Sequence, residues 1–211
     1  MIAAVVPVKS LDAAKSRLAP RLGLDNARQL SLTMLADVLE ALLAVPEVDR
    51  VAVTTSDAEV GDAATAAGAE VLLREDPGLN PSIEAAAAEL LPDPENALLV
   101  LLGDVAGACT DDLSRFIRSS PRRGVGLAPS RDGGTSALLR RPRDIIPAGF
   151  GRESAKRHRE YAESAGAQLR EMPLPSLSLD LDAPEDLDAF LATPRGGHRT
   201  RVLLHALGIA R

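Results

Sequence analysis

Short apolar runs alternate with helix-like segments along the first 129 residues, and this alternation limits the possible folds more than any other feature. The apolar runs are rich in Val, Leu and Ile and are predicted to be strands; they cover residues 2–8, 51–55, 70–73, 97–103 and 125–129. The segments between them space their apolar residues three and four apart and are predicted to be helices; they cover residues 26–45, 57–67, 81–91 and 111–119. Such alternation is typical of an α/β protein, in which helices cover both faces of a mostly parallel sheet. Ligands are then expected at the carboxyl ends of the strands.

Beyond residue 129 the pattern becomes less regular. Further strands are predicted over residues 135–140, 168–172 and 176–181, and further helices over residues 152–166 and 184–192. This second half of the chain is expected to bind the substrate that accepts a transferred group. With no internal repeat and no long linker, residues 1–193 are predicted to form one domain with a mixed, mostly parallel sheet. Residues 194–211 are predicted to be a basic tail or short helix, with the helix over residues 202–209.

Composition argues against several classes of protein. Aromatic residues make up only 2% of the chain and the net charge is −6, which disfavours nucleic-acid binding by base stacking or by a basic surface. The single Cys109 cannot form an internal disulfide, and no apolar run approaches the ~20 residues of a membrane-spanning helix. Without a basic leader at its start, the chain is expected to be cytoplasmic, with neither a nucleic acid nor a membrane as partner.

Two glycine-containing motifs lie close together in the second half of the chain. Gly134 and Thr135 belong to a Gly-Gly-Thr sequence that exposes backbone N–H groups, and Gly151 precedes Ser154 where a helix is predicted to begin. Taken separately, the first motif has a tight turn as its alternative interpretation, and the second has an ordinary helix start. Together they predict a binding site for a small dianion or trianion.

The residues around these motifs add a weaker signal. Arg152 and Lys156 carry positive charge near the second motif. His158 lies four residues after Ser154, on the same predicted helix face, although packing or solvation is the favoured role for this histidine.

A basic loop follows the first predicted strand. Lys9, Lys15 and Arg17 lie where a parallel α/β sheet would bind a polyphosphate. The glycine patterns of P-loops and of dinucleotide-binding folds are absent. A solvated basic surface is the alternative interpretation, but the position after the first strand favours a function.

Three aspartates are candidate ligands for Mg²⁺. Asp104 follows the buried run at residues 97–103, where a carboxylate is well placed for a hard cation that also contacts substrate phosphates. Asp180 and Asp182 are two residues apart at the end of a predicted strand, so both side chains would project from one face and repel each other without a cation. The alternatives are a turn residue at Asp104 and a helix cap at Asp182.

Missing motifs narrow the chemistry further. The chain has three histidines, no Cys–His arrangement and no Gly-x-Ser-x-Gly sequence, which argues against acyl transfer through a covalent intermediate. An acceptor that already carries an ionised phosphate needs positioning and charge neutralisation rather than a general base. The sequence therefore favours phosphate chemistry on a nucleotide.

Several motifs occur in an order and spacing that resemble a known family. They are Pro7-Val8-Lys9, Ala14-Lys15-Ser16-Arg17-Leu18, Gly78-Leu79-Asn80, Gly103-Asp104, Gly133-Gly134-Thr135, Phe150-Gly151 with Ser154 and His158, and the run from Leu179 to Leu187. Over residues 1–192 the chain resembles the 2-phospho-L-lactate (phosphoenolpyruvate) guanylyltransferases of deazaflavin coenzyme F-420 biosynthesis. The resemblance implies a nucleotidyltransferase A-like α/β/α sandwich.

The resemblance also implies a role for each candidate residue. Thr135, Gly151 and Ser154, with Gly134 beside them, would bind the phosphorylated acid; Asp104, Asp180 and Asp182 would hold Mg²⁺; Lys9, Lys15 and Arg17 would act on the triphosphate of GTP; and Asn80 would lie near the guanosine. In the implied reaction, the acceptor phosphate attacks the α-phosphorus of GTP and pyrophosphate leaves. Phosphoenolpyruvate, 2-phospho-L-lactate and phosphoglycerate remain alternative acceptors, and a homodimer is compatible with the family.

Two other functions remain open at this point. One is a different nucleotidyltransferase, or a nucleotide-sugar glycosyltransferase of related fold that binds its metal through an Asp-x-Asp pair. The other is a non-catalytic nucleotide-binding module whose acidic residues only cap helices.

Overall fold

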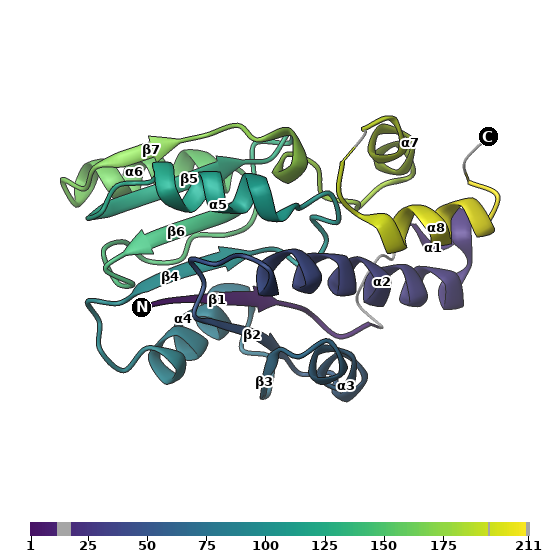
Figure 1. Ribbon diagram of the computed structural model, residues 1–211, viewed down its shortest axis with the longest axis horizontal. Helices are drawn as coiled ribbons and strands as arrows, with labels where there is room; N and C mark the ends of the chain where they lie inside the picture. The colour runs from purple at the N-terminus through teal and green to yellow at the C-terminus, as the bar shows by residue number, and fades with distance from the viewer. Residues whose placement is uncertain (12–17, 194, 210–211) are drawn as a thin grey trace.

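The computed structural model describes residues 1–11, 18–193 and 195–209, and these form one mixed sheet covered by helices (Figure 1). The strands follow the order β3-β2-β1-β4-β6-β5-β7. Their bounds are Ile2–Pro7 (β1), Arg50–Thr55 (β2), Glu70–Leu73 (β3), Ala97–Leu101 (β4), Gly124–Pro129 (β5), Thr135–Arg141 (β6) and Leu169–Glu171 (β7). Strand β6 is antiparallel to both of its neighbours, β4 and β5, whereas all other pairings are parallel. The prediction of a mostly parallel, mixed sheet is confirmed.

Both faces of the sheet are buried, which explains why its central strands are continuously apolar. Ala4 and Val6 of β1 pack on one side with α2, α3 and α5, and Ala3 and Val5 pack on the other side with α4 and α6. These helices span Leu24–Leu43 (α2), Ala58–Ala66 (α3), Leu79–Leu90 (α4), Thr110–Ser119 (α5) and Ser154–Ser164 (α6). Figure 1 shows α2 and α5 crossing the same face of the sheet. The layers are those of the predicted α/β/α sandwich.

The prediction of a strand over residues 176–181 is wrong. The chain there forms a short 3₁₀ helix, Pro175–Leu177 (η1), and then runs to residue 183 without regular structure. Leu177, Leu179 and Leu181 are nevertheless buried, which accounts for the alternating apolar pattern. Alternating burial does not require a sheet partner, and Pro175 has a fixed φ suited to the first position of a 3₁₀ turn.

The C-terminal part of the described chain packs on the same body. Helices α1 (Ala19–Leu22), α7 (Pro184–Ala192) and α8 (His198–Ala206) enclose a third apolar cluster, in which Leu204 meets Leu30 and Met34 of α2. Asp37 of α2 accepts hydrogen bonds from the backbone N–H groups of Arg199 (3.0 Å) and Thr200 (2.8 Å), so it serves the free donors at the start of α8. The helix expected in the basic tail therefore exists, begins earlier than predicted and lies against α2.

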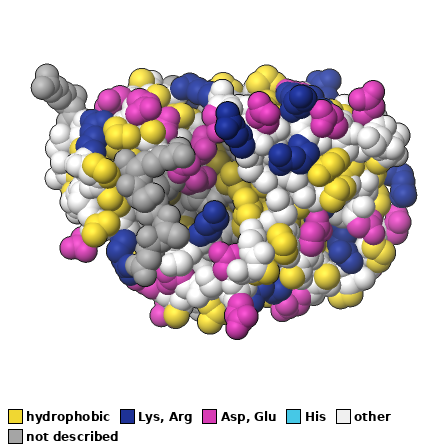
Figure 2. Space-filling model, turned by 180° about the vertical axis from the view of Figure 1, so that it is seen from behind, with side chains coloured by type: hydrophobic (Ala, Val, Ile, Leu, Met, Phe, Trp, Pro, Cys, Tyr) yellow, Lys and Arg dark blue, Asp and Glu magenta, His cyan; other side chains and the backbone are white. Residues whose placement is uncertain are grey.

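One face of the molecule shows no dominance of one charge. On the face seen in Figure 2, acidic and basic side chains are interspersed, in keeping with a chain of 24 Lys and Arg and 30 Asp and Glu residues. No helix within the described residues is both long and apolar enough to cross a membrane.

Candidate active site

The antiparallel direction of β6 brings the two halves of the predicted site to one edge of the sheet. Strands β1, β2 and β4 end at this edge, and β6 begins there with Thr135. Just past the end of β4, the backbone N–H of Leu102 donates to the carbonyl of Ser136 at 3.1 Å, two residues before Asp104. Thr135, a predicted acceptor ligand, thus begins β6 beside the end of β4. Asp104, a predicted metal ligand, lies just beyond that end.

The turn at residues 130–134 is organised by a carboxylate. Asp132 accepts hydrogen bonds from the Ser130 hydroxyl and from the backbone N–H of Gly134 (2.9 Å), and these bonds hold the pKa of Asp132 below its ordinary value. The carbonyl of Gly133 accepts from the backbone N–H of Ala155 in the first turn of α6, at 3.2 Å. This bond joins the two predicted glycine motifs, so they form one structural unit.

At the centre of this unit lie three buried side chains, Thr135, Ser154 and His158. The Ser154 hydroxyl lies 3.1 Å from Thr135 Oγ1, and His158 Nδ1 lies 3.0 Å from the same oxygen. His158 is therefore a packed residue, as favoured from the sequence, but it also contacts a predicted acceptor ligand. Its position one turn after Ser154 indicated the shared helix face, whereas the contact with Thr135 depends on the fold.

The second glycine motif is held from α4. Asn80 receives a hydrogen bond from the backbone N–H of Phe150 (2.8 Å) and donates one to the Phe150 carbonyl (3.1 Å). Gly151 follows with a φ of 123°, a region that side-chain-bearing residues rarely adopt. The side-chain amide of Asn80 is thus hydrogen-bonded to Phe150, next to Gly151 of the second motif. The predicted contact of Asn80 with the guanosine remains a prediction.

An ion pair between the buried Arg140 and the partly exposed Glu84 braces the loop that leads into this motif, and it was not predicted from the sequence. Arg140 is fully buried and donates to Glu84 of α4 at 2.7 and 3.2 Å and to the carbonyl of Ile146 at 2.8 Å. Glu84 also accepts from the backbone N–H of Ala148 at 2.7 Å. The partners are 56 residues apart, so no local pattern indicates the pair.

The acidic residues form the electrostatic part of the site. The backbone N–H of Leu181 donates to the carbonyl of Asp104 at 3.2 Å, which brings the segment carrying Asp180 beside the end of β4. Burial raises the pKa of Asp180 to about 6, and the negative charges of Asp104, Asp132 and Asp182 add to the rise. Like charges are therefore concentrated where the sequence predicts a cation.

The donor set at this point fits Mg²⁺, which prefers carboxylate oxygens and commonly takes only one or two of them, with substrate phosphates and water as its other ligands. Within the described ranges, no three His, Cys, Asp or Glu side chains form a ready-made metal centre. Asp182 lies at the start of α7, where its backbone N–H donates to Asp186 at 3.1 Å, so the strand geometry expected for Asp180 and Asp182 is wrong. Asp104 and Asp180 are therefore better supported than Asp182 as candidate ligands for Mg²⁺.

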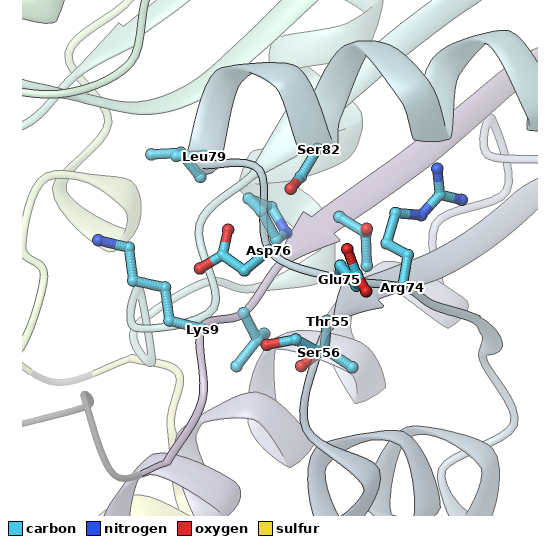
Figure 3. A pocket seen from close by; sticks show the side chains of 11 residues that line it. Lys9, Thr55, Ser56, Arg74, Glu75, Asp76, Leu79 and Ser82 are labelled. Carbon is cyan, nitrogen blue, oxygen red and sulfur yellow. The ribbon is translucent and has the colours of Figure 1, made fainter.

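A hollow open to solvent adjoins this site at the ends of β1 and β2 and the start of α4 (Figure 3). Its lining residues are Pro7, Val8, Lys9, Thr54, Thr55, Ser56, Arg74, Glu75, Asp76, Leu79 and Ser82. Figure 3 shows Lys9 at one margin of the hollow and the Ser82 hydroxyl directed into it. Lys9 lies here as predicted, whereas the other polar lining residues were not predicted; the expected strand order could have indicated the loops after β2 and β3. Lys15 and Arg17 lie outside the described residues.

A seven-stranded mixed sheet of this order, covered by helices on both faces, is shared with nucleotidyltransferase-like α/β proteins. Solved structures share the fold: a putative nucleotide-diphospho-sugar transferase from Desulfovibrio desulfuricans superposes with a TM-score of 0.77 at 18% identity, covering 98% of this chain and 96% of that one. A nucleotidyl transferase from Methanothermobacter gives a TM-score of 0.64 at 22% identity, covering 92% and 99%. At these identities the likeness shows the fold alone.

Sequence relatives define the family. Residues 2–210 match the family model described as "Guanylyl transferase CofC like", and the chain belongs to this family. A phosphoenolpyruvate guanylyltransferase of Sphaerobacter thermophilus is 41% identical over 88% of this chain and 90% of that protein. A 3-phospho-D-glycerate guanylyltransferase of Colwellia psychrerythraea is 31% identical over 90% and 92%. The chain is therefore a nucleotidyltransferase of the guanylyltransferase type, and both the family and the fold predicted from the sequence are confirmed.

Proposed function

We propose that this protein transfers GMP from GTP to a small phosphorylated three-carbon acid, in a Mg²⁺-dependent step of deazaflavin coenzyme F-420 biosynthesis. An oxygen of the acceptor phosphate attacks the α-phosphorus of GTP, the bond to the bridging oxygen breaks, and pyrophosphate leaves. The observation that carries the proposal is the meeting of two units at one sheet edge: the Thr135–Ser154 unit and the Asp104–Asp180 pair.

The acceptor phosphate would bind at the joined glycine motifs. Thr135 and Ser154 supply hydroxyl groups there, and Gly151 leaves the backbone open because no other atoms lie within 4 Å of the point where its side chain would start. The acceptor oxygen is ionised near neutral pH and needs no general base, so the task of these residues is to hold the phosphate in line with the α-phosphorus. The Arg140–Glu84 pair and Asn80 keep the loop behind them in place.

The nucleotide would bind in the hollow beside Lys9, with Lys15 and Arg17 as further cations for the triphosphate. Asp104 and Asp180 would hold Mg²⁺, with Asp182 nearby, and the raised pKa of Asp180 supports this assignment. A bound Mg²⁺ neutralises charge on the phosphates during transfer.

We name phosphoenolpyruvate as the acceptor. The 41% identical Sphaerobacter protein carries that name, whereas the relative named for 3-phospho-D-glycerate is 31% identical. 2-Phospho-L-lactate has nearly the same size and charge and is the alternative to be tested beside it.

The test is a screen of pyrophosphate release. GTP and ATP are each combined with phosphoenolpyruvate, 2-phospho-L-lactate, 3-phospho-D-glycerate and a sugar 1-phosphate, with Mg²⁺ or with a chelator, and products are identified by mass spectrometry. The expected result is a GMP adduct of phosphoenolpyruvate that requires Mg²⁺. A sugar product, or no product with any three-carbon acid, would refute the proposal.

A further inference from the structure

His158 lies directly behind the proposed acceptor site in a fixed orientation. The side chain is fully buried, and its ring makes edge contacts with Phe150 (centroids 5.1 Å apart) and Tyr161 (6.5 Å). Nδ1 lies 3.0 Å from Thr135 Oγ1, and Nε2 lies 3.0 Å from the backbone nitrogen of Gly149. Both ring nitrogens are therefore committed to defined partners.

The Gly149 contact determines where the proton of the ring resides. A backbone N–H can only donate, so Nε2 must accept and carries no hydrogen. Burial, together with the positive charges of Arg140 and Arg157, lowers the pKa of His158 to about 4, so the ring is neutral near pH 7. A neutral ring keeps one proton, which is then on Nδ1. His158 consequently donates a hydrogen bond to Thr135 Oγ1.

This donation sets the polarity of the two hydroxyl groups. Thr135 Oγ1 accepts from His158, and Thr135 and Ser154 bond to each other at 3.1 Å. Whichever hydroxyl donates within this pair, the other retains its hydrogen for a further acceptor. If Nδ1 were bare instead, it would draw the Thr135 hydrogen toward itself. The Nδ1–H form therefore leaves a hydroxyl hydrogen to donate to an anion.

We propose that His158 is a positioning residue, which acts through Thr135 to present the Thr135–Ser154 hydroxyl pair as a hydrogen-bond donor to the phosphate of the acceptor. His158 itself does not touch the substrate. The inference rests on the proposed function, because it takes the acceptor site to be at this pair. It adds a role for the residue four positions beyond Ser154, which is to donate a hydrogen bond to Thr135.

Two substitutions separate the two hydrogen bonds of the ring. Asparagine carries its amide near the position of Nδ1, so His158→Asn keeps a donor for Thr135 and loses the acceptor for Gly149. Glutamine carries its amide near the position of Nε2, so His158→Gln keeps an acceptor for Gly149 and loses the donor to Thr135. Each variant removes one hydrogen bond and the same aromatic contacts, which makes them matched controls for each other.

The expected result is a selective loss of acceptor binding in one variant. His158→Gln should raise the acceptor KM about tenfold, while His158→Asn should stay within about threefold of the unsubstituted chain, a difference typical of one hydrogen bond. The KM for GTP should change in neither. Equal increases in both variants, or parallel changes in the KM values for GTP and acceptor, would indicate a merely structural role and overturn the proposal.

The tautomer is tested without any activity. The chain has only three histidines, so ¹⁵N NMR of the imidazole groups, assigned with His158→Gln, reads each ring separately. His158 should remain in the neutral Nδ1–H form from about pH 8 to about pH 5.5. A neutral Nε2–H form or a charged ring at neutral pH would overturn the positioning role even if GMP transfer were found. Conversely, absence of transfer to every three-carbon acid would refute the proposed function and leave the tautomer readable.

Discussion

The proposed acceptor side and the proposed nucleotide side of the site are stabilised by different interactions. On the acceptor side, Thr135, Ser154 and His158 are buried and hydrogen-bonded to one another, and α4 braces the adjoining loop through Asn80 and Glu84. On the proposed nucleotide side, Lys9 is exposed at the edge of an open hollow, and the pKa of Asp180 is raised by burial and by neighbouring negative charge. The proposed acceptor side is therefore preorganised by the protein itself, whereas the proposed nucleotide side would be completed by the cation and polyphosphate that we propose to bind there.

The most severe test of this contrast removes one carboxylate from the nucleotide side. Asp104→Asn should lower turnover by about a thousandfold, because several kcal/mol of transition-state stabilisation depend on charge at this point. Folding stability should not fall, since the change relieves repulsion with Asp180. Pyrophosphate release and thermal unfolding measure the two effects.

Asp62→Asn is the matched control for this experiment, because Asp62 is exposed on α3. It should leave both turnover and stability unchanged. Near-normal turnover in Asp104→Asn would remove the metal assignment and, with it, the electrostatic half of the comparison.

On the acceptor side, the largest effect is expected on stability. Glu84→Gln leaves the fully buried Arg140 without a charged partner and should lower the free energy of unfolding by about 3 kcal/mol. The measurement is urea denaturation monitored by circular dichroism. Glu89→Gln breaks the more exposed pair with Arg74 and should cost under about 1 kcal/mol. Equal effects of the two substitutions would show that the α4 brace is no more than a surface ion pair.

Removing a single hydroxyl should separate acceptor binding from nucleotide binding. Thr135→Val should raise the acceptor KM about thirtyfold, because a hydrogen bond to a charged group contributes about 2 kcal/mol, and leave the KM for GTP unchanged. The neighbouring Ser136 hydroxyl is buried and has no hydrogen-bond partner among the described residues, so Ser136→Ala is a matched control with little expected effect. The measurement is steady-state kinetics with each substrate varied in turn. A rise in the KM for GTP as well as in the acceptor KM would contradict the prediction.

The same contrast explains which features the sequence could predict. The alternation in residues 1–129 predicted the strands and their helices because burial on both sheet faces leaves a local apolar signature. The two glycine motifs were recognisable because their backbone requirements are local too. The hydrogen bonds that join the two motifs are not local, because each connects residues about 20 positions apart: Ala155 with Gly133, and His158 with Thr135. They depend on the direction of β6.

The segment after Pro175 shows the opposite failure. Its alternating leucines predicted a strand, yet they are buried by an irregular segment that has no sheet partner. Asp180 and Asp182 therefore do not project from one face of a strand, which was the reason given for pairing them. Asp180 instead lies near Asp104, because the backbone N–H of Leu181 donates to the Asp104 carbonyl, and no local sequence pattern indicates this hydrogen bond. The positions of the three aspartates and the family resemblance both predicted a shared cation, but no local pattern indicated which of them would lie side by side.

The smallest expected effect is a pH dependence of opposite sign on the two sides. The pKa of His158 is about 4 in the folded chain and about 6.5 when unfolded, so below pH 6.5 the unfolded chain takes up a proton that the folded chain refuses. Stability should fall between pH 6.5 and pH 4, by under about 2 kcal/mol at pH 5. The pKa of Asp180 is about 6 when folded and 3.8 ordinarily, so protonation below pH 6 removes a buried charge, relieves repulsion and raises stability.

Urea denaturation of three chains between pH 7 and pH 5 separates these opposing contributions. The His158→Gln chain loses the destabilising contribution of the histidine and should resist acid better than the unsubstituted chain. The Asp180→Asn chain loses the compensating contribution of the carboxyl and should resist acid less well. If His158→Gln left the acid dependence unchanged, the ring would be accessible to protons in the folded state, and the acceptor side could not be the closed, preorganised unit that distinguishes it from the nucleotide side.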